Sequence, residues 1–399
     1  MRRSLFTGLL LLCSSIGLSG CWDRTEINDV AFVIGTSVDK EKNLYRSTLQ
    51  IALPGNLGGS GSQGGGGGTS GDKKYYLESK TGITLRKSFL EVQEGNSRKI
   101  SFSHRRTLLI GEEVAKEGIS SMLDQFARIP QNRLSSLVAV TEGPAYMILD
   151  AQAPMEQFPS EMIRKLMNQF TKRPVTLKYL TNDLLTDGID VSLPYFSLQE
   201  AVPEGLTETK TKKNIQITGL ALFKGDKLVG VLKGKEVRMI NLAMNQATSP
   251  DILVPGPDGR GYVTIKLTEN VVTLRPVIRG DDITMNMRIL AKGSVIENDS
   301  DYSLDSERTM HKLEQNASKE IIQQIHSGLH LLQDKYHSDV LGFGRTIQEK
   351  DPPAWERFKD RWEKLYPTVK VVIDTELHVE NIGAVDKPFG RKDEVLKHD

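Results

Sequence analysis

Hydrophobic residues change their spacing several times along the first half of the chain, which predicts both strands and helices. Short apolar runs bounded by polar residues are typical of buried strands, and apolar residues three or four positions apart are typical of helices that bury one face. Strands are expected at 30–35, 45–53, 106–110 and 134–140, and helices at 82–94, 112–128, 155–170 and 177–185. Thr176 directly precedes the last of these helices and is expected to cap it.

The second half of the chain alternates apolar and polar residues, as strands of antiparallel sheets do. Residues 215–223 and 228–232 flank the turn Lys224-Gly225-Asp226-Lys227, which predicts a β-hairpin. An extension of this hairpin into a meander is expected, with strands at 262–267, 271–278, 283–290 and 293–297, and a half-buried strand is expected at 369–379.

Two helices are expected to pack on this second group of strands. Residues 305–334 predict a long helix with one apolar line, formed by Leu313, Ala317, Ile321, Ile325, Leu329 and Leu332. Residues 353–365 place Trp355 and Trp362 on one stripe, and we interpret both as core residues rather than recognition residues. The expected fold class is α+β and multidomain, with mixed and antiparallel sheets and helices packed on one face.

Two polar segments interrupt the regular pattern. Residues 55–71 contain five consecutive glycines and predict a flexible loop between two strands. This stretch lacks the Gly-Lys-Ser/Thr of a Walker loop and the spacing of a dinucleotide-binding loop, so we do not expect it to bind phosphate. Residues 203–214 are the best linker candidate, which divides the chain into an N-terminal domain at 21–202 and a C-terminal α+β domain at 215–390.

The N-terminus has the pattern of an exported protein. Two arginines precede an apolar run from Leu5 to Leu12, and small residues lead to Leu18-Ser19-Gly20-Cys21. These are the marks of a signal peptide, predicted here at 1–20, and the run is too short for a membrane span of roughly 20 residues. The last four residues resemble a bacterial lipobox, which implies S-diacylglyceryl and N-acyl groups on Cys21. The alternative is an ordinary signal peptide with a chance cysteine.

Charge and cysteine content narrow the expected partners. The chain has 52 Lys and Arg and 51 Asp and Glu, and cleavage of the signal peptide would remove two arginines and leave 50 against 51. Such a balance argues against a nucleic-acid partner, which usually meets a basic face. Cys21 would be the single remaining cysteine, so no intramolecular disulfide is expected. Attachment to a membrane would then depend on acyl chains, which contribute about 0.8 kcal/mol per buried methylene.

Several segments recur together in the order and spacing of a known family. They are Gly20-Cys21-Trp22-Asp23-Arg24-Thr25-Glu26-Ile27-Asn28-Asp29, Ser103-His104-Arg105-Arg106 with Leu109-Ile110-Gly111-Glu112-Glu113, Gly219-Leu220-Ala221-Leu222-Phe223, Ser338-Asp339-Val340-Leu341-Gly342-Phe343-Gly344, and Trp355 and Trp362 followed by Tyr366-Pro367. None of these segments is chemically diagnostic alone. Together they resemble the Ger(x)C spore germination lipoproteins, from Cys21 to about Phe389.

The resemblance implies the lipoprotein C subunit of a nutrient germinant receptor, needed for spore germination. It implies a lipid anchor on the extracytoplasmic face of the spore inner membrane, beside integral-membrane subunits of the A and B types. It also implies a multidomain α+β fold with no catalytic activity and no cofactor. Asp23, Arg24 and Glu26 follow the anchor directly. They either contact the membrane surface or a membrane partner, or form a solvated tether.

Few residues have a spacing that predicts chemistry. His326, His330 and His337 fall within roughly 40° of one another on a helix, so a metal site is conceivable. Ser327 stands where a zinc protease needs its glutamate, and we prefer three polar residues at the solvent margin, with no metal. The segment His104-Arg105-Arg106 either binds an anion or forms the polar edge before a strand, and we prefer the edge.

Two other functions share the export signal. An extracytoplasmic solute-binding lipoprotein would have two α/β lobes around a cleft, which the antiparallel pattern of the second half does not favour. A cell-wall hydrolase would need an acid–base pair or a metal, and no such set stands out in the sequence. The preferred prediction is therefore a non-enzymatic, lipid-anchored receptor subunit.

Overall fold

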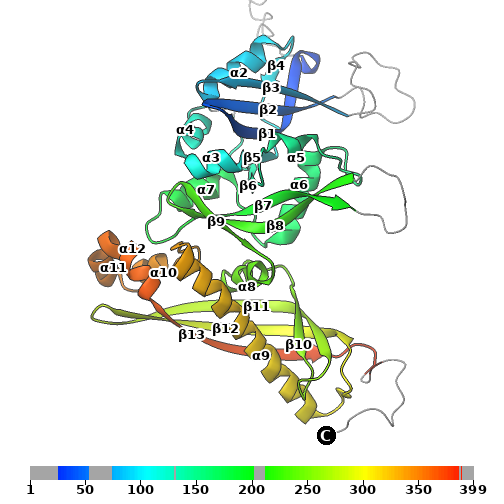
Figure 1. The fold of residues 1–399 in the computed structure, drawn as a ribbon, viewed down its shortest axis with the longest axis vertical. Coiled ribbons are helices and arrows are strands. Elements are labelled where there is room, and N and C mark those ends of the chain that lie inside the picture. The colour runs from blue at the N-terminus through cyan, green and yellow to red at the C-terminus, as the bar shows by residue number, and fades with distance from the viewer. Residues whose placement is uncertain (1–25, 54–73, 130–131, 202–211, 386–387, 389–399) are drawn as a thin grey trace, which may run out of the picture.

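The computed structural model describes residues 26–53, 74–129, 132–201, 212–385 and 388, and within them the strands form one sheet of nine and one of four. The two sheets follow one another along the long axis of the molecule, each with its own helices (Figure 1). The predicted α+β class is confirmed. Cys21, the signal peptide and the stretch at 55–71 lie outside the described residues. None of the helices in the described parts is long and apolar enough to cross a membrane.

The first sheet has a parallel centre and antiparallel flanks. Its strands are β1 (Val30–Glu41), β2 (Leu44–Ala52), β3 (Tyr75–Gly82), β4 (Lys99–Ser101), β5 (Thr107–Gly111), β6 (Leu137–Thr141), β7 (Ser192–Ala201), β8 (Lys212–Lys224) and β9 (Lys227–Lys233). They lie in the order β3-β2-β1-β5-β6-β7-β8-β9, and β4 also pairs with β1. The pairs β1–β5, β5–β6 and β6–β7 are parallel. The four strands predicted in this part correspond to β1, β2, β5 and β6.

Helices cover both faces of the first sheet. One face packs α2 (Leu85–Glu94), α3 (Glu112–Glu117), α4 (Ser120–Arg128) and α7 (Leu177–Leu184), and the other packs α5 (Tyr146–Asp150) and α6 (Pro159–Phe170). Along β5, Leu108 and Ile110 face the first group of helices, whereas Leu109 faces the second. The expectation of helices on one face is therefore too narrow for this sheet, because its parallel strands are buried on both sides. Thr176 caps α7 as predicted, since its side chain accepts a hydrogen bond from the backbone N of Tyr179.

The helix predicted at 112–128 is two helices, α3 and α4, separated at Gly118. Gly118 has a φ of 128°, a conformation that an L side chain rarely adopts. The hairpin turn between β8 and β9 lies against this break, where the carbonyl of Asp226 accepts a hydrogen bond from the backbone N of Ile119 at 3.0 Å. The Asp226 carboxylate accepts a second hydrogen bond, from the backbone N of Ser120 at 3.2 Å. Ser120 is the first residue of α4, so this bond pairs an N–H group that has no partner within the helix.

The segment expected to be a linker, 203–214, connects two strands of one sheet. Residues 202–211 lie outside the described part of the chain, and β8 begins at Lys212. β7 and β8 pair in an antiparallel ladder that runs from Ser192↔Leu222 to Ala201↔Lys212. The predicted hairpin is confirmed as β8 and β9, but it completes the first sheet instead of opening a C-terminal meander. The first sheet therefore extends to Lys233.

The second sheet consists of long strands in the order β10 (Asp251–Pro255), β11 (Tyr262–Arg279), β12 (Asp282–Asn298) and β13 (Lys370–Asn381). β10, β11 and β12 are antiparallel, and β13 adds in parallel to β12. The four short strands predicted between 262 and 297 are thus two continuous strands, β11 and β12. The register shift at Leu267/Glu269 leaves Thr268 without a partner in the ladder and disturbs the alternation within β11, which explains the interruption in the pattern.

Helices pack on one face of the second sheet, as predicted. The long helix α9 (Glu307–His330) lies across the strands (Figure 1), and the six apolar residues predicted for its buried line are all buried. It continues into a short π-helical turn at Leu331–Lys335. Three short helices, α10 (Phe343–Lys350), α11 (Pro352–Phe358) and α12 (Trp362–Leu365), follow before β13.

The β8–β9 hairpin belongs to two hydrophobic cores at once. Ala221 and Phe223 face the core of the first sheet. Leu220 and Leu222 point the other way and pack in the core that also contains α9 and the helix α8 (Lys235–Ala243). We call the first sheet with its helices, up to Lys233, the first domain, and the chain from α8 onward the second domain. Because adjacent strand residues face opposite sides, the hairpin holds the two domains together through apolar packing.

Candidate functional site

The residues next to the predicted lipid anchor lie at the margin of the described chain. Cys21, Asp23 and Arg24 are outside the described residues. Glu26 is exposed, and its carbonyl accepts a hydrogen bond from the backbone N of Asp29 at 3.0 Å. The first helical turn, Ile27–Asp29, leads directly into β1. The body of the protein therefore begins only a few residues after Cys21.

The three histidines considered for a metal are all exposed. His326 and His330 lie on the solvent side of α9, and Nδ1 of His330 pairs with the carboxylate of Asp334. His337 lies beyond the helix, in a left-handed conformation with a φ of 49°. Among the described residues, no group of three or more His, Cys, Asp or Glu side chains could hold a metal ion.

The segment His104-Arg105-Arg106 separates into three different environments. His104 packs edge-on against Phe32, with ring centroids 4.9 Å apart. Arg106 reaches the carboxylate of Glu161 on α6. Both contacts are consistent with a polar edge before β5, whose position is confirmed.

Arg105 is the unexpected member of this segment, because it is fully buried. Its guanidinium lies 4.5 Å from the ring centroid of Phe126, and its Nε donates to the Oγ of Ser136 at 3.3 Å. Its two terminal nitrogens have no hydrogen-bond partner among the described residues. Burial lowers the pKa of Arg105 to about 10, so the side chain is still charged at neutral pH.

Trp355 and Trp362 are core residues, as predicted. They are 2% and 5% exposed, and their rings meet edge to face at 5.5 Å. Nε1 of Trp362 donates a hydrogen bond to Oδ2 of Asp339 at 3.1 Å. This bond connects the tryptophan cluster to the Ser338–Gly344 segment, which joins the two domains.

Asp339 is the centre of this joint and is completely buried. Its carboxylate accepts hydrogen bonds from the backbone N of Phe343 and of Gly344, both at 2.9 Å, in addition to the bond from Trp362. Burial raises the pKa of Asp339 to about 7, and the nearby carboxylate of Asp190 raises it as well, although these three donors favour the ionised form.

Residues 188–190 of the first domain complete the joint. The backbone N of Asp190 donates to the carbonyl of Asp339 at 3.0 Å, and the backbone N of Arg345 donates to the carbonyl of Gly188 at 2.7 Å. The carboxylate of Asp190 accepts from the backbone N of Asp339 at 2.8 Å and from Nζ of Lys224 at 3.2 Å. Direct backbone contact of this kind fixes the spacing of the two domains.

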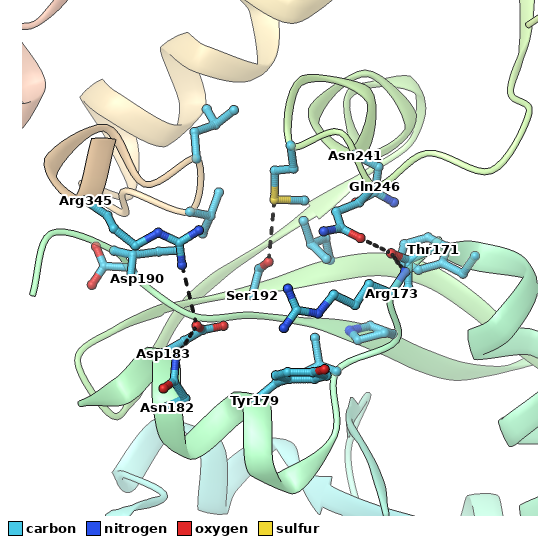
Figure 2. Close-up of a pocket in the computed structure, with 18 residues that line it drawn as sticks. Thr171, Arg173, Tyr179, Asn182, Asp183, Asp190, Ser192, Asn241, Gln246 and Arg345 are labelled. Carbon is cyan, nitrogen blue, oxygen red and sulfur yellow. Dashed lines mark hydrogen bonds and ion pairs between the residues drawn. The ribbon is translucent and has the colours of Figure 1, made fainter. Parts of the chain in front are cut away.

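A pocket of about 210 Å³ opens beside the joint, between the two domains. The first domain contributes the loop after α6, the helix α7 and the start of β7, with Arg173, Tyr179, Asp183 and Ser192. The second contributes Asn241 of α8, Gln246 in the loop after it and Arg345 at the start of α10. Figure 2 shows these side chains converging from both sides.

Charges of both signs face this pocket. The guanidinium of Arg173 lies 3.8 Å from the ring centroid of Tyr179, and Figure 2 shows it extending across the pocket toward the side that carries Asp183. Oδ1 of Asp183 accepts a long hydrogen bond from the side-chain amide of Asn182 at 3.5 Å, and its ion pair with the guanidinium of Arg345 is long as well, at 3.9 Å. Oγ1 of Thr171 donates to the side-chain oxygen of Gln246 at 3.2 Å, which joins the two walls.

Sequence reasoning missed both the joint and the pocket. Arg173 falls between the helices expected at 155–170 and 177–185, and neither Asp183 nor Asp190 has a spacing that distinguishes it. The one available signal was the Ser338–Gly344 segment of the family resemblance, which turns out to contain the buried carboxylate of the joint.

The fold and the site define a multidomain α+β protein whose two domains meet at a tight joint with a polar pocket beside it. Family models match almost the whole chain: "Spore germination protein N-terminal domain" at residues 23–198, and "Spore germination B3/ GerAC like, C-terminal" at residues 218–383. The chain belongs to this family of spore germination proteins. The predicted family is confirmed, and it is a non-enzymatic one.

Individual relatives match over nearly their full length. A putative spore germination protein YfkR of Bacillus subtilis (strain 168) is 36% identical over 97% of this chain and 99% of its own. Spore germination protein KC of the same strain is 26% identical over 98% of both chains. The crystal structure of the GerBC protein matches with a TM-score of 0.57 at 17% identity, over 89% of this chain and all of the other, which shows a shared fold.

Proposed function

We propose that the protein is a lipid-anchored, non-enzymatic subunit of a nutrient germinant receptor, needed for spore germination. The observation that carries this proposal is the match of the mature chain to the spore germination family, with Cys21 directly before it. The first family match begins at residue 23, two positions after Cys21. Acylation of Cys21 would therefore attach the family body to a membrane with almost no spacer.

The short spacer limits where the body can lie. Ile27, the first residue of a helical turn, is six positions after Cys21, and six extended residues reach roughly 20 Å. The first sheet would lie next to the lipid headgroups. The second sheet, at the far end of the molecule in Figure 1, would project away from the membrane. This orientation supports contact between the first domain and integral-membrane subunits of the A and B types in the spore inner membrane.

Replacing the anchor residue tests the proposal. Cys21→Ala is expected to release the protein from the membrane fraction and to abolish germination in response to the nutrient, with vegetative growth unchanged. Cys13→Ala is the matched control, because Cys13 lies within the predicted signal peptide and would be absent from the mature chain. Intact-mass analysis of the native protein should show the acylated chain beginning at Cys21. Retention of Cys21→Ala in the membrane with normal germination would contradict the proposal.

A further inference from the structure

The pocket between the two domains has the chemistry of a ligand site. Its wall carries two guanidinium groups, Arg173 and Arg345, and two carboxylates, Asp183 and Asp190. Asp190 is already bonded to Nζ of Lys224 and to the backbone N of Asp339, whereas the nearest cationic group to Asp183 is 3.9 Å away. No ion pair is found for Arg173 within the described residues; its contact is the ring of Tyr179. A guanidinium held flat on an aromatic ring keeps its edge free for a planar anion.

Amide and hydroxyl groups complete the polar part of the wall. Asn241 is only 4% exposed although it lines the pocket, so its amide is screened from bulk water. Ser192 and Gln246 lie on opposite walls, one from each domain. In such a partly closed space, charged groups interact more strongly than they do on an open surface.

Apolar side chains line the rest of the pocket, including Val175, Leu220, Met244 and Leu341. A site with a cation, an anion and an apolar wall fits a molecule that carries the complementary groups. The volume of about 210 Å³ is below the roughly 300–1,000 Å³ of pockets for drug-sized ligands. The occupant must therefore be small.

We propose that this pocket binds a small zwitterion of the α-amino-acid type, with its carboxylate on Arg173, its ammonium group on Asp183 and its side chain against the apolar wall. Because Asp183 comes from the first domain and Asn241, Gln246 and Arg345 from the second, the bound molecule touches both domains. Ligand binding would hold the two domains at one spacing, since it adds contacts beside the joint of Asp190 and Asp339. The link from binding to a nutrient response rests on the proposed function; the binding itself does not.

Calorimetry on the full-length protein, purified in detergent, tests this assignment. The twenty standard L-amino acids are titrated one at a time at millimolar concentration. Each one that binds is compared with its carboxamide, which lacks the carboxylate, and with its deaminated acid, which lacks the ammonium group. Binding of at least one amino acid, with a loss of about tenfold or more for both analogues, is expected. Absence of binding by every amino acid, or equal binding of the deaminated acid, would overturn the assignment.

Variants locate the binding in the pocket. Arg173→Gln and Asp183→Asn are each expected to weaken binding by about tenfold or more. Lys178→Gln is the matched control, because Lys178 is exposed on the same helix, α7, and does not line the pocket. Each variant is checked by thermal unfolding, so that loss of fold is not taken for loss of binding. Wild-type affinity in the correctly folded Arg173→Gln variant would overturn the assignment.

Failure of this inference can be distinguished from failure of the proposed function. If Cys21→Ala abolishes germination but the wild-type protein binds no amino acid, the receptor role stands and the pocket assignment falls. If the protein binds amino acids while Cys21→Ala germinates normally, the pocket assignment stands and the anchored receptor role falls.

Discussion

Replacing Gly188 by alanine is expected to loosen the joint between the two domains. Gly188 has a φ of +74°, and an added Cβ would lie 2.5 Å from the backbone N of Arg345 and 2.5 Å from the carbonyl carbon of Gly344. Both neighbours are backbone atoms, so the segment at Gly188 and the segment at Gly344 and Arg345 must move apart. The separation would weaken the bond that Arg345 donates to Gly188 and the bond that Asp190 donates to Asp339, now 2.7 and 3.0 Å.

The size of this effect follows from a comparison with Gly143→Ala. Gly143 has a similar φ of +64°, but a Cβ there meets nothing within 4 Å. Both variants have the strain of left-handed alanine, about 1–2 kcal/mol, partly offset by about 0.4–1 kcal/mol from the less flexible unfolded chain. Gly188→Ala alone adds overpacking of about 1–3 kcal/mol and two weakened hydrogen bonds of about 0.5–1.5 kcal/mol each. It should therefore lose at least about 2 kcal/mol more than Gly143→Ala.

Urea unfolding followed by tryptophan fluorescence measures this difference. Trp355 and Trp362 are two of the three tryptophans in the chain, and both lie against Gly344 in the joint. Hydrogen exchange at the amides of Asp190 and Arg345 should accelerate in Gly188→Ala and remain unchanged in Gly143→Ala. Equal free energies of unfolding for the two variants, within about 0.5 kcal/mol, would refute the description of the joint as a close backbone contact.

Two further predictions concern buried charges. The pKa of Asp339 is raised from 3.8 to about 7. The stability that its protonated carboxyl group contributes is therefore complete below pH 3.8 and is lost as the pH rises through about 7. The free energy of unfolding of wild type relative to Asp339→Asn should therefore grow by about 2 kcal/mol as the pH falls from about 8 to about 5.5, and a gap independent of pH would contradict this. The free energy of unfolding of Arg105→Met should be at most about 1 kcal/mol below that of wild type, or higher than it, because the buried guanidinium has no carboxylate partner. In the same urea series Phe126→Ala should lose about 3–5 kcal/mol, and an equally large loss in Arg105→Met would show that the cation is needed.

Local patterns identified most elements of the fold, because alternation and helical spacing survive wherever one face is buried. The buried line of α9 and the hairpin of β8 and β9 are examples. The pattern could not show which sheet the hairpin joins, since both faces of β8 are apolar and pack in different cores. Helix 112–128 was predicted in one piece because its apolar spacing continues past Gly118, where a contact distant in sequence ends the helix.

The site could be predicted only in part, and for a physical reason. Arg173, Asp183 and Arg345 come from separate elements, and nothing in their local sequence marks them as neighbours. The sequence marks Asp339 only as part of a family-like segment, and the burial of its carboxylate depends on contacts with Trp362 and the backbone of α10. Convergence of this kind is a property of the tertiary structure.

The membership of β8 and β9 in the first sheet determines how the protein can be divided for expression. A recombinant fragment that ends at residue 198, where the first family match stops, would lack the partner of β7 and display an open strand edge that invites aggregation. A fragment that starts at residue 218 would keep most of the β8–β9 hairpin without the rest of the first sheet, and Phe223 would be exposed to water. A cut directly after Lys233 keeps every ladder of the first sheet intact, although it bares Leu220 and Leu222, so a polar substitution at these two positions would be needed for a soluble amino-terminal half.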